Sequence, residues 1–124
     1  MVLNLGSLIY SRYVLTAAHC VERYDIKNMV VIAGCNSLGE KPQTSNIYKV
    51  TGLILNPEYD RENIINDIAV IKLDRDVELS SKISTVCLPS LTENSFDVID
   101  KDVVLTGWYL YINNFLIFIY KNQI

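Results

Sequence analysis

Short apolar runs separated by turn residues are the feature that most constrains how this chain can fold. Runs such as "VVIAG" and "IAVIKL" are rich in β-branched residues and too short for ordinary helices, which favours strands. Stretches such as "NPEYDREN" and "LDRD" stand between them, with the Asn, Pro and Asp that favour tight turns. The pattern predicts an all-β barrel or sandwich. The expected strands are Ser7–Ile9, Tyr13–Thr16, Met29–Ala33, Tyr48–Leu55, Ile68–Leu73 and Val103–Thr106.

Helical structure is expected at one place only, a single turn after Thr16 that runs through Ala17, Ala18 and His19. The chain has 124 residues, of which 50% are hydrophobic and 20% charged, so we expect one folded domain rather than a disordered segment. Its net charge is -3 and its Lys and Arg residues are scattered. Without a basic field, nucleic acid is not an expected partner.

Three cysteines, Cys20, Cys35 and Cys87, cannot all pair with one another. Their spacing matches no CxxC-type motif, and a single histidine is too few for a Cys/His zinc cluster. We therefore expect no metal and no cofactor, and at least one cysteine whose partner lies outside this sequence. The first residues, "MVLNLGSLIYSRYV", have no basic region before a continuous apolar core, so no signal peptide is expected here.

Composition changes abruptly after Trp108, where the tail "YLYINNFLIFIYKNQI" begins. Its apolar run is shorter than the roughly 20 residues that a membrane helix needs, so no membrane contact is expected. One interpretation is a buried or aggregation-prone strand. The other is translated intron, because the codons for Trp108 and Tyr109 must contain GTAY, which is acceptable as a splice donor. Sequencing the spliced transcript separates the two.

The chemistry of the chain centres on "YVLTAAHC", which contains His19. A histidine can accept a proton from a hydroxyl and return it to a leaving group, and it works best when a carboxylate orients its ring. Asp67, in "NDIAVIKL" just before an apolar strand, is the candidate carboxylate. Structural roles are the alternatives, because a lone histidine is more often structural than catalytic and an Asp after Asn is usually a turn residue.

The sequence contains four motifs in this order: "GSLIYSRYVLTAAHC", "NDIAVIKL", "VCLP" and "LTGW". Together they resemble the trypsin-like (chymotrypsin-fold, S1) serine endopeptidases, in particular secreted insect-type members. The resemblance implies that His19 is the general base and Asp67 the orienting carboxylate. It implies two six-stranded antiparallel β-barrels with the active site between them. Residues 1–108 would then be the first barrel with the start of the second, and residues 109–124 a hydrophobic tail foreign to the family.

The sequence also departs from this family. The nucleophile of the family lies in a "GDSGGP" motif, and this sequence contains none. The oxyanion hole and the specificity pocket would be missing with it. We therefore expect the chain as given to be inactive, although the resemblance implies a secreted endopeptidase that acts on proteins or peptides. The alternative is a non-catalytic, protease-like binding protein.

Cysteine pairing differs from the family in the same way. The family bridges the cysteine after the histidine to one in a "CGGSLI" motif, which here reads "NLGSLI" with Asn4 in that place. Cys20 is therefore expected to be unpaired. A bridge from Cys20 to Cys35 fits the count, but the two residues are expected on different strands. By resemblance, Cys87 would join an amino-terminal regulatory chain.

Overall fold

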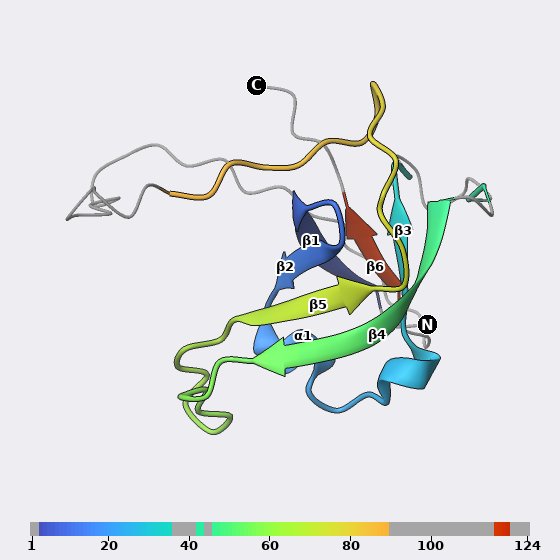
Figure 1. The fold of residues 1–124 in the computed structure, drawn as a ribbon. Helices are drawn as coiled ribbons and strands as arrows, with labels where there is room; N and C mark the ends of the chain where they lie inside the picture. Colours follow the sequence, from blue (N-terminus) through green and yellow to red (C-terminus); the bar gives the residue numbers. More distant parts are fainter. Residues whose placement is uncertain (1–2, 36–41, 44–45, 90–115, 120–124) are drawn as a thin grey trace.

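The structure is a computed structural model that describes residues 3–35, 42–43, 46–89 and 116–119, the last of these by their backbone only. The described residues form a closed barrel with the strand order β1-β2-β5-β4-β3-β6 (Figure 1). A short helix, α1, lies between β2 and β3 in the sequence, and a 3-10 turn, η1, follows it. The elements are β1 Leu3–Tyr10, β2 Tyr13–Thr16, α1 Ala18–Val21, η1 Ile26–Asn28, β3 Val30–Ala33, β4 Ile47–Leu55, β5 Ala69–Leu73 and β6 Leu116–Ile119.

Buried and more exposed side chains alternate along the strands, and the buried ones form the core inside the barrel. In β5, Ala69, Ile71 and Leu73 are buried while the residues between them are more exposed, as expected when successive side chains point to opposite faces. Each fully buried Ile or Leu contributes about 1.5–3 kcal/mol relative to an exposed one. The largest fully buried side chains are those of Tyr48, Leu8, Met29, Ile71, Leu73, Val14, Val21 and Val31.

A bulge in β4 changes which of its residues face the core. The register with β5 shifts between Val50 and Gly52, so one extra residue stands on the β4 side. Val50 is buried before the bulge, whereas Leu53 packs against the core after it and Ile54 is 65% exposed. The bulge keeps an apolar face toward the barrel interior as the strand bends.

The connector after β5 runs back along β1. The backbone N–H of Val77 donates to the carbonyl of Ser11, and that of Val86 donates to the carbonyl of Leu8, both at 2.8 Å. Cys87 follows on the exposed side of this connector. Within the described residues, no helix is both long enough and apolar enough to span a membrane.

The predicted all-β barrel is confirmed, with small differences in where its strands and helix begin. The bounds of β2 are as predicted, and β3, β4 and β5 each start one residue from the expected position. The helix begins at Ala18 rather than Ala17. β1 begins at Leu3, because its first four residues pair with β6. The expected strand Val103–Thr106 lies outside the described residues.

The pairing of β6 differs from the antiparallel pairing that is predicted for the barrel and found between its other strands. β6 runs parallel to both β1 and β3, whereas the other strand pairs in the described barrel are antiparallel. The described backbone of Leu116–Ile119 is a strand, and it does not decide between the two interpretations of the tail. The origin of these residues in an intron stays a prediction, as does the domain boundary at residue 108.

Candidate active site

Strand pairing brings the two predicted site residues together. His19 lies in α1, directly after β2, and Asp67 lies just before β5. β2 and β5 are antiparallel neighbours in which Thr16 pairs with Ala69, so the end of one strand lies beside the start of the other. Two residues 48 positions apart in the sequence therefore meet at the same edge of the barrel.

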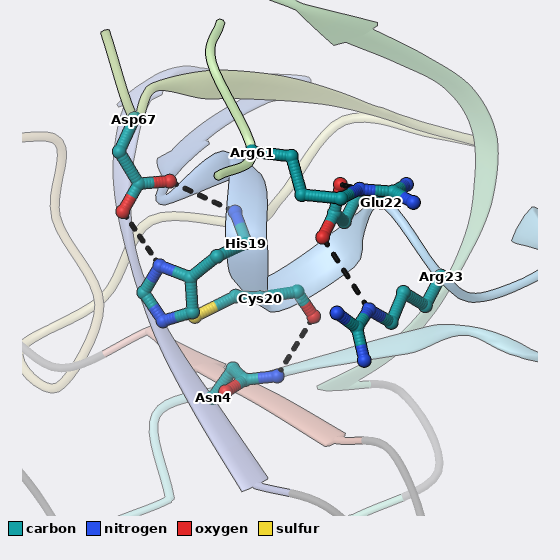
Figure 2. Close-up of polar contacts among 7 residues, drawn as sticks. All are labelled: Asn4, His19, Cys20, Glu22, Arg23, Arg61 and Asp67. Carbon is teal, nitrogen blue, oxygen red and sulfur yellow. Dashed lines mark hydrogen bonds and ion pairs between the residues drawn. The ribbon is translucent and has the colours of Figure 1, made fainter. Parts of the chain in front are cut away.

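One carboxylate contacts His19 twice (Figure 2). Asp67 Oδ2 lies 2.6 Å from His19 Nδ1, and the backbone N–H of His19 donates to Asp67 Oδ1 at 2.8 Å. Because an ionised carboxylate only accepts hydrogen bonds, this contact places a hydrogen on Nδ1 and leaves the lone pair of a neutral ring on Nε2. The His19 side chain is 53% exposed, so the ring is accessible.

The charge on Asp67 is maintained by its hydrogen bonds. Burial by itself raises the pKa of this carboxyl. The backbone and ring of His19, the charge of a protonated His19 and the backbone N–H of Ala18 outweigh burial and hold the pKa below its ordinary value. Asp67 is therefore ionised at neutral pH and can stabilise an imidazolium.

The segment that presents Asp67 has an unusual backbone. Ile64 and Asn66 have φ angles of 54° and 55°, in the left-handed region. Asn tolerates this conformation, whereas a β-branched Ile adopts it only under strain. Asn66 Nδ2 donates to the carbonyl of Glu58 at 2.9 Å, and Asp60 pairs with Ile65. These contacts close the loop immediately before Asp67.

An ion pair ties the same loop to the helix that carries His19. Arg61 Nε lies 2.6 Å from Glu22 Oε2, and Arg23 Nε lies 3.5 Å from Glu22 Oε1 (Figure 2). The Glu22 side chain is only 5% exposed, although both arginines are largely exposed. The sequence does not predict this contact, because a charge pair between two distant loops leaves no local pattern.

Cys20 lies beside the second ring nitrogen of His19. Its Sγ is 3.3 Å from His19 Nε2 (Figure 2). Burial, and secondly the negative charge of Asp67, raise the pKa of this thiol, so it remains protonated and can donate to Nε2.

The side chain of Asn4 contacts the backbone of Cys20. Asn4 Nδ2 donates to the carbonyl of Cys20 at 3.0 Å. Cys20 carries a free thiol, in agreement with the sequence prediction, and the possible bridge to Cys35 is not formed. Among the described residues, no group of three or more His, Cys, Asp or Glu side chains is arranged to hold a metal ion.

Comparison with known proteins identifies the family. The family model described as Trypsin matches residues 3–114, a range that includes the four motifs, His19 and Asp67. This chain belongs to the trypsin family. The match extends through most of the chain and agrees with the resemblance seen in the motifs.

Two insect relatives of the trypsin family and one solved structure illustrate the similarity. Chymotrypsin of Phaedon cochleariae is 35% identical over 105 residues, which cover 85% of this chain and 37% of the relative. Chymotrypsin-2 of Vespa crabro is 36% identical over 109 residues, covering 87% of this chain and 47% of the relative. The scabies mite inactivated protease paralogue S-D1 has a TM-score of 0.61 at 24% identity, covering 69% of this chain and 35% of that structure, and supports the fold alone. The chain thus spans less than half the length of these relatives.

Proposed function

We propose that this chain is the part of a trypsin-family serine endopeptidase that supplies the general base, His19, and its orienting carboxylate, Asp67. The observation that carries the proposal is the double contact of Asp67 with the ring and the backbone of His19. A carboxylate in this position fixes the tautomer that a base needs and stabilises the charge that the ring acquires. Proteins or peptides are the proposed substrates of the complete enzyme.

The proposed proton path runs through His19 Nε2. In the complete enzyme, Nε2 takes the proton of a serine hydroxyl as its oxygen attacks the substrate carbonyl, and later gives that proton to the leaving amine. Asp67 stays ionised throughout. In this chain the hydrogen-bond donor next to Nε2 is the Cys20 thiol, which is a weak donor and leaves the nitrogen able to accept a stronger one.

We further propose that the chain as given does not hydrolyse peptides. The sequence contains no "GDSGGP" motif, and Ser80 and Ser81 lie in a turn of the connector that the Ser80–Ile83 bridge closes. Neither serine has neighbouring glycine amides to stabilise an oxyanion. An extracellular location and a regulatory chain joined through the exposed Cys87 belong to the same proposal, since both follow from the family resemblance.

Active-site labelling tests the absence of hydrolytic activity. A fluorophosphonate probe, which reacts with activated serines, should leave the purified chain unlabelled while it labels an active trypsin-family enzyme under the same conditions. Stoichiometric labelling of the chain would contradict the proposal and would identify the reactive serine by mass spectrometry.

The role of Asp67 can be tested on the single histidine of the chain. Because no other imidazole is present, the ring ¹⁵N resonances of His19 are unambiguous. In the unsubstituted chain at high pH we expect the Nδ1–H tautomer, and in Asp67→Asn a mixture that includes Nε2–H, because an amide can also donate. Asp76→Asn, which removes a carboxylate that bonds Arg12 and Ser11, is the matched control and should leave the tautomer unchanged. An identical tautomer in Asp67→Asn would remove the support for Asp67 as the orienter.

The alternative of a non-catalytic binding protein is favoured by one observation. Ile64, Ile65 and Ile68, which flank Asp67 in the sequence, are 59%, 54% and 43% exposed. Exposed apolar side chains gathered on one segment often mark a protein contact. Saturable binding of one purified protein, weakened by Ile64→Asp but not by Leu79→Asp in the connector, would support this second function.

A further inference from the structure

Two strands of the barrel, β1 and β3, face each other across a single intervening strand, β6. β1 pairs with β2 through one edge and β3 pairs with β4 through one edge, and the remaining edges of β1 and β3 face the place that β6 occupies. Figure 1 shows β6, in red, between β1 in dark blue and β3 in cyan. Without a strand in this place, both edges would have unsatisfied backbone groups, which is a known liability of sheet edges.

The position of β6 is defined by its pairing on both sides. Leu116 is the register partner of Leu3 in β1 and of Val30 in β3, and Ile119 is the partner of Gly6 and Ala33. Because β6 is parallel to both neighbours, β1 and β3 run in the same direction. A strand placed between them is therefore parallel to both neighbours, and a single register lets it pair with the backbone of each.

On the β3 side, apolar residues line both faces of this position. On the outer face, Ile32 is 4% exposed and packs in a cluster with Leu5, and both residues have Phe118 as their register partner. On the inner face, Val31 and Ala33 belong to the main core. A strand between parallel neighbours with both faces covered is expected to be a continuous apolar run, and "LIFI" is such a run.

We propose that the gap between β1 and β3 is a strand-acceptor site for an extended, uncharged, apolar segment that runs parallel to both edges. In this chain the segment that fills it intramolecularly is Leu116–Ile119. Leu116–Ile119 therefore complete the barrel instead of being a dispensable extension. This inference is independent of the proposed proteolytic function.

Occupancy of the acceptor site is linked to the placement of His19 through β1. Asn4, the register partner of Ile117, holds the carbonyl of Cys20, and the carbonyl of Leu5 accepts a hydrogen bond from Thr16 Oγ1 at 2.8 Å. Thr16 ends β2, and Cys20 follows His19 directly. The segment that fixes the backbone of β1 therefore also supports the start of α1.

Paired cysteines test the register in the full chain. In a background with Cys20→Ser, Cys35→Ala and Cys87→Ser, the register partners Leu5 and Phe118 are both replaced by Cys. Their Cα atoms lie roughly 5 Å apart across adjacent strands, within reach of a disulfide. The matched control is Leu5→Cys with Leu116→Cys, displaced by two residues to roughly 8 Å, beyond that reach.

On mild oxidation, the matched pair should form an intramolecular disulfide about tenfold faster than the control pair. Equal rates in the two variants would overturn the register and with it the proposal. Covalent dimers in place of cross-linked monomers would overturn the intramolecular assignment and give the site to the same segment of a second copy.

Hydrogen exchange provides a second test that does not depend on removing the cysteines. Ile117→Pro removes a backbone donor from the middle of β6, and Asn122→Pro places proline in the same tail but outside the strand. With Ile117→Pro, amides of Leu3–Gly6 and Val30–Ala33 should exchange at least about tenfold faster than with Asn122→Pro. Faster exchange throughout the barrel in Ile117→Pro alone would support the same proposal more strongly, and identical exchange in the two variants would overturn it.

Discussion

Asp67 and Ile71 are only four residues apart, but different forces hold them in place. Ile71, in the middle of β5, is fully buried and held by apolar packing. Asp67, just before the same strand, has a 20% exposed side chain and is held by hydrogen bonds to His19. The barrel strands and their buried side chains, called the wall below, determine where the ends of β2 and β5 lie. Polar contacts then orient the side chains of His19 and Asp67. Wall substitutions should therefore affect the fold, whereas site substitutions should affect local geometry.

The largest loss of stability is expected for a substitution in the wall. Ile71→Ala removes buried methyl groups and leaves a cavity, so the free energy of unfolding should fall by about 2–5 kcal/mol. Ile54→Ala, at a position 65% exposed in the neighbouring strand, should change it by less than about 0.5 kcal/mol. Urea unfolding measures both. Similar losses in the two variants would mean that the wall is not the main source of stability.

A smaller loss is expected where the wall meets the connector. Gly34 has a φ of +67°, and a Cβ there would lie 2.8 Å from Ile83 Cγ1. Gly34→Ala should lower the free energy of unfolding by about 1–3 kcal/mol, because of the clash and the left-handed backbone. Gly52→Ala is the control, since its Cβ would meet no atom closer than 3.4 Å. Equal stability of Gly34→Ala and the unsubstituted chain in urea would contradict the described packing.

The ion pair beside the site should contribute less again. Glu22→Gln removes the charge that Arg61 contacts and should lower the free energy of unfolding by about 1 kcal/mol, because Glu22 is buried and Arg61 is exposed. Asp76→Asn breaks a pair with Arg12 in which both side chains are exposed, so it should lower the free energy of unfolding less than Glu22→Gln does. A double-mutant cycle with Arg61→Gln isolates the coupling, and a coupling of zero would remove this link between α1 and the loop.

The smallest expected effect is the change with pH in the stability that Asp67 contributes. Because the folded-state pKa of Asp67 lies below its ordinary value of 3.8, the stability that its charge contributes is present above that value and is lost as pH falls through the lower, folded-state pKa. The difference in unfolding free energy between the unsubstituted chain and Asp67→Asn should therefore shrink in acid. The same difference for Ile54→Ala, which changes no charge, should be flat with pH. A flat curve for Asp67→Asn would contradict the hydrogen-bonded carboxylate.

Much of the wall could be predicted from the sequence because its information is local. The short apolar runs "YVLT" and "IAVIKL" give the bounds of β2 and β5 nearly to the residue. The family motifs predicted that His19 and Asp67 lie near each other, and strand pairing explains why they meet. These successes concern residues whose neighbours along the chain already indicate their environment.

The remaining features depend on partners that local sequence does not indicate. The early start of β1 depends on pairing with β6 more than one hundred residues away, and the buried position of Glu22 depends on Arg61. The bulge at Val50 and Gly52 likewise becomes clear only when β4 is placed against β5. Pairing between distant segments, rather than composition, decided these features.

The hydrogen bond from Asn4 to Cys20 also determines how this region responds to its redox environment. In the family resemblance, a cystine would join these two positions, and its formation would require an oxidising compartment. An amide-to-carbonyl bond forms equally in oxidising and reducing conditions. Attachment of α1 to β1 should therefore be insensitive to thiol reductants, whereas the adjacent Cys20 sulfur remains available for chemistry that a bridged cysteine cannot undergo.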